Sequence, residues 1–128
     1  MKSASAWWLA LLLTGCATPQ ANAPLAERQQ QYLAELPKVR QRPWGPCEST
    51  FHFLADTGAA GVPTVVQALD TFGGLTNVLM RALIVDGARH YSQGTNLVVR
   101  PIMDRALRDS AADVQAVAQH WLDKQQKK

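Results

Sequence analysis

Residue types that perform chemistry are sparse in this 128-residue chain, and their spacing matches no common catalytic or metal-binding motif. The three histidines stand far apart and form no pair at the short spacing typical of zinc ligands: His52, His90 and His120. Four aspartates could supply the paired carboxylates that hydrolysis uses, but each falls near a turn or on a polar face: Asp56, Asp70, Asp86 and Asp104. The sequence therefore predicts no metal site, no cofactor and no catalytic residue. An enzyme or metal binder would need the fold to gather at least two of these histidines and aspartates in one polar pocket.

One of the two cysteines stands at the end of an apolar leader. Lys2 precedes an apolar run over residues 4–13, which is too short to cross a hydrocarbon core about 30 Å thick. The run fits the central region of a secretory signal peptide. It ends in Leu12-Leu13-Thr14-Gly15-Cys16, which resembles the lipobox of bacterial lipoproteins, where small residues precede an obligatory cysteine.

This resemblance implies a lipid anchor on Cys16. The thiol would receive diacylglycerol, signal peptidase II would cleave between Gly15 and Cys16, and the new amino group would be acylated. Two or three acyl chains make a durable anchor, whereas one holds only reversibly. Ala17 rather than Asp follows the cysteine, and by resemblance to the sorting rule of enterobacterial lipoproteins this favours the outer membrane, facing the periplasm. Ordinary secretion with cleavage after Ala23 would leave Pro24 directly after the cut, a poor position for that peptidase.

Lipidation of Cys16 would leave Cys47 as an unpaired thiol in the mature domain. A buried, inert cysteine is the interpretation we favour, because free cysteine is often buried. An intermolecular disulfide is the first alternative, since an odd cysteine in an oxidising compartment can pair between chains. A catalytic thiol would need a positioned base, and His52, five residues away, is the one candidate nearby in the sequence.

Trp44 lies between Pro43 and Gly45 on a proline-stiffened loop and is the candidate partner-binding residue. Aromatic side chains are enriched in binding hot spots, and a rigid loop loses little entropy on binding. Arg40 and Arg42 stand beside it and could contact an acidic partner or lipid headgroups. The alternative is that Trp44 folds back to cover the helices.

Composition argues against nucleic acid as a partner. After loss of Lys2 with the leader, roughly twelve Lys and Arg face ten Asp and Glu, so the mature chain is close to neutral. The proposed division is a signal peptide over residues 1–15, a lipidated cysteine and flexible tether over 16–24, and one domain over 25–128.

The elements that position these residues are expected to be helices. Apolar residues recur at helical spacing in five ranges: 25–36, 62–72, 75–83, 95–109 and 114–122. Pro37 is expected to end or kink the first helix, residues 40–46 to form a loop, and Ser110 with Asp113 to form a capping box before the last helix. The prediction is a small all-α bundle of four or five short helices. The alternative is a small α+β domain, because Asp86-Gly87 within residues 83–91 could form the turn of a hairpin.

Three functions follow from these expectations. The first is a non-catalytic lipoprotein that holds an envelope protein at the outer membrane, like secretin pilots and assembly factors in size, anchor and helicity. The second is an immunity protein that neutralises a periplasmic toxin, and the third is a small enzyme or metal binder. Gene neighbourhood separates the first two, since a secretin gene favours one and an adjacent effector gene the other.

Overall fold

The computed structural model describes residues 23–127, so the predicted signal peptide, the Gly15–Cys16 cleavage point and the tether before Ala23 lie outside the described residues. Within that range the chain is helical and contains no strand, which confirms the all-α prediction. The α-helices are α2 (Leu25–Val39), α3 (Gly45–Thr57), α4 (Val62–Thr71), α5 (Val78–Ser92), α6 (Arg100–Leu107) and α7 (Ala112–Gln126). Short 3₁₀ helices join them: η1 (Gly58–Gly61), η2 (Leu75–Asn77) and η3 (Leu97–Val99).

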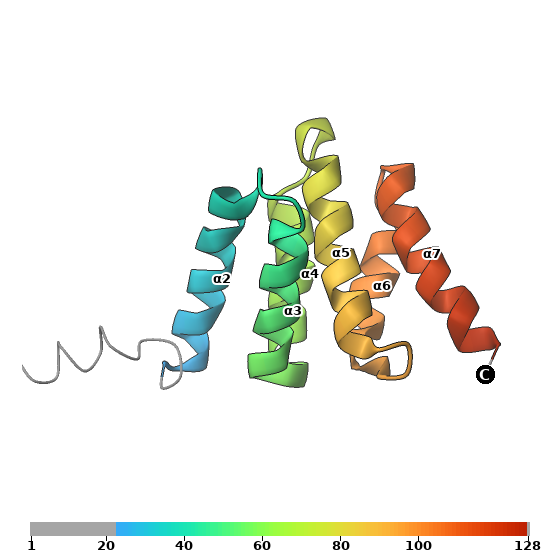
Figure 1. Ribbon diagram of the computed structural model, residues 1–128, viewed down its shortest axis with the longest axis horizontal. Coiled ribbons are helices and arrows are strands. Elements are labelled where there is room, and N and C mark those ends of the chain that lie inside the picture. Colours follow the sequence, from blue (N-terminus) through green and yellow to red (C-terminus); the bar gives the residue numbers. More distant parts are fainter. Residues whose placement is uncertain (1–22, 128) are drawn as a thin grey trace, which may run out of the picture.

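The helices form two layers (Figure 1). α2, α3, α5 and α7 lie side by side in the front layer, with α4 and α6 behind them. The core between the layers is almost entirely apolar, and its largest fully buried side chain is Trp121 of α7. Its indole N–H donates to the Ser92 hydroxyl at 2.9 Å, so the polar edge of the ring is satisfied inside the bundle. None of the helices among residues 23–127 combines the length and hydropathy needed to cross a membrane.

Residues 83–91 lie in the middle of α5, so the hairpin alternative is wrong. Ile84, Val85 and Ala88 are buried, as a helix in the centre of the front layer requires. Gly87 serves packing rather than a turn. A Cβ at this position would overlap the Cys47 carbonyl oxygen, so the glycine lets α3 and α5 approach closely.

Helix boundaries differ from the expectations in several places. α2 continues through Pro37 to Val39, because burial of Leu36 and Val39 holds its last turn against the core. α3 begins at Gly45 within the predicted loop, with Pro46 in its first turn, where a missing N–H costs nothing. The expected helix over 95–109 is shorter and starts with η3, since the Asn96 side chain accepts from the Val98 N–H at 3.0 Å.

The predicted capping box at Ser110 is also wrong. α7 begins at Ala112, and its N-cap residue is Ala111, which makes no side-chain capping bond. The Asp109 carboxylate instead accepts from the Ala111 N–H at 2.9 Å. Asp109 is buried and accepts hydrogen bonds from arginine side chains. It, and not Ser110, therefore supplies the side-chain hydrogen bond just before α7.

Candidate functional site

The loop between α2 and α3 carries Trp44 in an unusual backbone conformation. Trp44 has φ 64° and ψ 5°, in the left-handed region that a bulky side chain rarely adopts. Trp44 is 60% exposed, so it is not buried against the helices. Trp44 is the N-cap residue of α3, and its carbonyl accepts the first helical hydrogen bond from Glu48 at 2.8 Å.

Close packing on both sides of Trp44 fixes this conformation. The Gly45 N–H donates to the Arg42 carbonyl at 3.0 Å, and the Arg42 N–H donates to the Val39 carbonyl at 3.0 Å. A Cβ on Gly45 would overlap the backbone of Val39, so the chain turns tightly against the end of α2. These contacts hold the loop rigid, with the indole directed to solvent.

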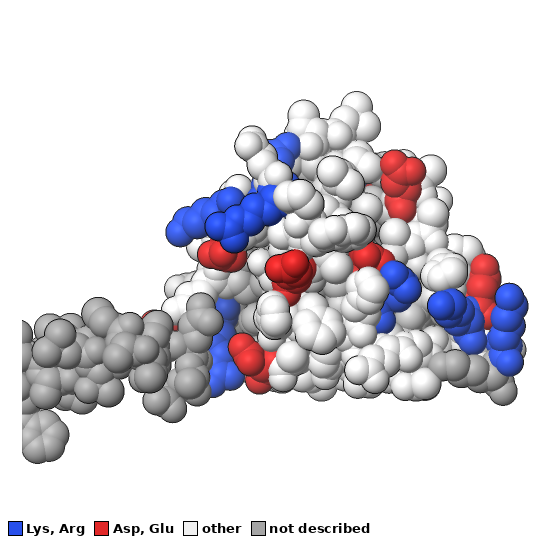
Figure 2. Space-filling view, in the orientation of Figure 1, with Lys and Arg blue, Asp and Glu red and all other residues white. Residues whose placement is uncertain are grey.

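The two arginines beside Trp44 have different surroundings. Arg40 donates from Nη2 to the Thr76 carbonyl at 2.7 Å, which ties the loop to η2 at the start of α5. That neighbouring segment exposes two leucines, Leu75 at 88% and Leu79 at 69%. Arg42 is exposed and lines the groove between α2 and α3. Basic side chains gather in Figure 2 where α2 meets α3, and the surface over α3 and α5 is mostly uncharged.

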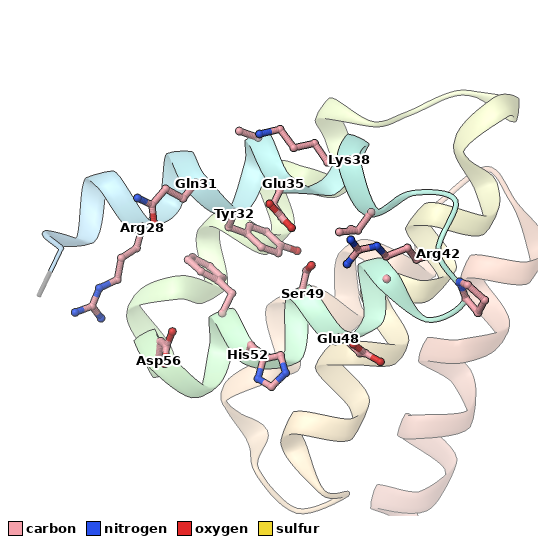
Figure 3. A pocket seen from close by; sticks show the side chains of 15 residues that line it. Arg28, Gln31, Tyr32, Glu35, Lys38, Arg42, Glu48, Ser49, His52 and Asp56 are labelled. Atoms are coloured by element: carbon pink, nitrogen blue, oxygen red, sulfur yellow. The ribbon is translucent and has the colours of Figure 1, made fainter. Parts of the chain in front are cut away.

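The groove between α2 and α3 has a volume of about 610 Å³ and is lined by charges of both signs (Figure 3). Tyr32 and Glu35 extend into it from α2, and Ser49 extends from α3. The Tyr32 ring stacks on Phe53 with centroids 4.4 Å apart, and its hydroxyl lies 2.7 Å from the Thr50 hydroxyl. Burial raises the pKa of Tyr32 above its ordinary range, although the Thr50 hydrogen bond opposes this shift. Tyr32 therefore stays neutral and forms part of the floor of the groove.

A second depression adjoins the groove along α3 and shares Glu48 and His52 with it, but it extends toward α5. Its volume is about 570 Å³, and it is lined by Trp44, Cys47, Glu48, Phe51, His52 and His90. It contains two of the three histidines, whereas His120 is exposed on α7 and lines neither depression. The fold thus brings together residues that the sequence places in separate segments.

Cys47 lies at the inner wall of this depression as a buried free thiol. Its Sγ donates to Asp86 Oδ2 at 3.8 Å, a weak hydrogen bond between α3 and α5. Burial, and next the negative charge of Asp86, raise the pKa of the Cys47 thiol to about 11. A nucleophilic cysteine needs a lowered pKa, so this environment argues against a catalytic thiol paired with His52.

Asp86 lies at the centre of the polar contacts in the α3–α5 depression. Its Oδ1 accepts from Arg89 Nε at 2.8 Å, one helical turn away. Its Oδ2 lies 3.4 Å from His90 Nε2 as well as 3.8 Å from Cys47 Sγ. In the sequence, this group is indicated only by the Asp-x₃-His spacing of residues 86 and 90. That spacing places both residues on one helical face, but only if residues 83–91 form a helix.

The chain was compared with known protein families, curated proteins and solved structures. No protein family, no curated protein and no solved structure matches the chain. The structure exposes all three residues expected to bind a partner, Trp44, Arg40 and Arg42, and Arg40 also contacts the Thr76 carbonyl.

Proposed function

We propose that this chain is a bacterial lipoprotein whose helical domain, anchored by Cys16 at the outer membrane and facing the periplasm, binds a protein of the cell envelope without catalysis. The anchor rests on the lipobox-like sequence that ends at Cys16. The binding role rests on Trp44, which is displayed on the bundle surface. The proposal groups this chain with secretin pilots and envelope assembly factors.

The observation that carries the binding proposal is the exposed indole of Trp44 on left-handed backbone. A non-glycine residue in this region costs about 1–2 kcal/mol. Leaving a large apolar side chain in water forgoes about 1.5–3 kcal/mol of burial energy. Neither the strained backbone nor the exposed ring stabilises the isolated domain. A partner that buries the ring on a rigid loop would gain the burial energy of the indole.

Neighbouring residues support a protein partner with an apolar contact surface. Leu75 and Leu79 are exposed at the segment to which Arg40 ties the Trp44 loop. A large exposed apolar side chain is unremarkable singly, but three of them around one end of a bundle are typical of an interaction surface. Arg42 at the border of this surface would favour an acidic rim on the partner.

A pair of glycine substitutions tests the binding proposal. Trp44→Gly removes the indole and suits the backbone, while Gln93→Gly makes the same kind of change at φ 51° at the end of α5. Envelope proteins crosslinked to the chain in intact cells are identified by mass spectrometry. We expect one specific partner to be recovered with the original chain and with Gln93→Gly, and to be lost with Trp44→Gly. Equal recovery with both variants would contradict the role of Trp44, and a soluble toxin as the captured protein would favour the immunity function.

A separate measurement tests the anchor. Cells that express the chain are labelled with a palmitate analogue, and membranes are separated by density. We expect label in the original chain at the outer membrane and none in Cys16→Ser. An unlabelled original chain, or one cleaved after Ala23, would contradict the lipoprotein proposal and leave the Trp44 test unaffected.

A further inference from the structure

Three side chains from two helices bring a sulfur, an oxygen and a nitrogen donor together in the α3–α5 depression. Cys47 Sγ, a carboxylate oxygen of Asp86 and a ring nitrogen of His90 all lie within 4.8 Å of one another. Asp86 Oδ2 lies 3.8 Å from Cys47 Sγ and 3.4 Å from His90 Nε2, so the three atoms form a compact triangle. This is the one such group of three potential metal ligands that residues 23–127 contain.

We propose that Cys47, Asp86 and His90 form a binding site for a single divalent transition-metal ion, of which Zn²⁺ fits best. This proposal departs from the sequence-based expectation of no metal site, which was drawn from the wide spacing of the histidines. The proposal rests neither on the lipid anchor nor on partner binding through Trp44, although Trp44 lines the same depression.

Two of the three donor separations are close to those of tetrahedral coordination. Zn²⁺ bonds of about 2.0–2.3 Å to oxygen, nitrogen and sulfur place neighbouring ligands about 3.3–3.6 Å apart. The separations of 3.4 Å and 3.8 Å from Asp86 Oδ2 are close to these values. Small rotations of the His90 and Cys47 side chains would complete the arrangement, and His90 has room to rotate because its side chain is 53% exposed.

The donor set also selects the kind of ion. A thiolate with an imidazole favours Zn²⁺ and related transition metals, whereas Mg²⁺ and Ca²⁺ prefer oxygen ligands throughout. One thiolate and one carboxylate would neutralise the charge of a divalent ion in this partly buried position. The three protein ligands leave the fourth position to water or to another side chain of the depression, where Glu48 and His52 are available.

Arg89 orients the carboxylate toward the proposed ion. It donates to Asp86 Oδ1, which leaves Oδ2 directed at Cys47 and His90. Outer hydrogen bonds of this kind fix the ligating oxygen in many metal sites. The Arg89 side chain is 27% exposed, so its Nη2, now 3.3 Å from His90 Nε2, can withdraw when the ring nitrogen turns to a metal.

Metal titration of the full chain tests the site. All variants carry Cys16→Ala, so that Cys47 supplies the one cysteine sulfur, and Co²⁺ and Zn²⁺ are the probes. We expect one Co²⁺ per chain with a thiolate-to-metal charge-transfer absorption, displacement of Co²⁺ by Zn²⁺, and affinity that increases with pH as the thiol loses its proton. Zn²⁺ should also raise the melting temperature.

Substitutions at the ligands and at a matched histidine decide the outcome. We expect Cys47→Ser to abolish the charge-transfer band and His90→Gln to weaken binding by more than about 100-fold, since changes even outside the ligand shell cost about 10- to 100-fold. His120→Gln, the control, should bind as the parent chain does. His90 is exposed, so its variant keeps the fold even if Cys47→Ser does not. Absence of stoichiometric binding, or equal loss with His90→Gln and His120→Gln, would overturn the proposal.

Discussion

The guanidinium of Arg81 and the carboxylate of Asp109 face each other inside the bundle and share two hydrogen bonds, Nε to Oδ2 at 2.9 Å and Nη2 to Oδ1 at 3.0 Å. Both side chains are only 2% exposed. The remaining Arg81 nitrogen donates to the Phe72 carbonyl at 3.0 Å and the Gly74 carbonyl at 2.7 Å. This pair therefore ties α5 both to the end of α4 and to the turn between α6 and α7.

Removal of one member of this pair should strongly destabilise the fold. Arg81→Met leaves the Asp109 carboxylate buried without its main partner, for which we expect a loss of about 3–5 kcal/mol in the free energy of unfolding. Urea unfolding followed by circular dichroism measures the loss. Arg100→Met is the control, because Arg100 and Asp104 form an exposed pair expected to contribute about 0–1 kcal/mol. Similar losses in the two variants would contradict a structural role for the buried pair.

The same carboxylate should make the protein sensitive to acid. Burial by itself raises the pKa of Asp109, but hydrogen bonds from Arg81, the Ala111 N–H and Arg105 outweigh it and lower the pKa below its ordinary value. A carboxyl whose folded pKa is lowered stabilises the protein above the unfolded pKa of about 3.9 and loses that contribution as pH falls through the folded value. We expect the free energy of unfolding to decrease below about pH 4. The decrease should be shallower in Asp109→Asn, and an equal slope in both proteins would assign the acid sensitivity to other groups.

Gly87→Ala tests the close contact of α3 and α5. The added methyl group would collide with the Cys47 carbonyl and the Thr50 side chain, so α5 has to move away from α3. We expect a loss of about 1–3 kcal/mol, the usual cost of overpacking, although alanine is the better helix former. Gly73→Ala is the control because its nearest neighbour, the Asp70 carbonyl oxygen, would lie at an ordinary 3.5 Å. A stabilising effect of Gly87→Ala would show that the interface can accommodate a larger residue.

Gly87 also illustrates how far the sequence could predict this fold. The helical class follows from apolar spacing, which for α4 and α7 agrees with the buried faces in the structure. The pattern of Asp86-Gly87 is equally typical of a turn, and only the contact with Cys47, forty residues away, shows that the glycine serves packing. The spacing of apolar residues indicates whether a segment is a helix or a strand, but it does not indicate which other segment it packs against.

The polar contacts were the least predictable part for the same reason. Arg81 lies in an amphipathic segment and Asp109 lies next to a predicted helix cap, so neither stands out in the sequence. Their pairing depends on how α5 packs against the turn between α6 and α7. Cys47, Asp86 and His90 likewise become neighbours only through the α3–α5 contact. Trp44 was identified from the sequence because its signal is local, a tryptophan held between proline and glycine on a short loop.

Alkylation of Cys47 should be slow and should depend on Asp86. With a pKa of about 11, the Cys47 thiol is far less ionised at pH 8 than an ordinary thiol of pKa about 8.5, so we expect iodoacetamide to react on the order of 100-fold more slowly than in the unfolded chain. Asp86→Asn removes a charge and a hydrogen bond that raise this pKa, and should accelerate the reaction. Mass spectrometry of the peptide that contains Cys47 gives the rate. Asp104→Asn, at an exposed carboxylate of α6, should leave the rate unchanged, and acceleration there would contradict the local effect.

Trp44→Gly and Gln93→Gly together test whether Trp44 has any role in stability. Both residues occupy left-handed backbone, at φ 64° and 51°, where glycine relieves about 1–2 kcal/mol of strain and costs about 0.5–1 kcal/mol in unfolded-chain entropy. The net change should be a stabilisation of about 0–1.5 kcal/mol for both proteins. A loss of about 3–5 kcal/mol for Trp44→Gly alone would mean that the indole packs as a core residue does. Because Trp44 is 60% exposed, we expect the two unfolding curves to shift alike, as the proposal of a binding role for Trp44 requires.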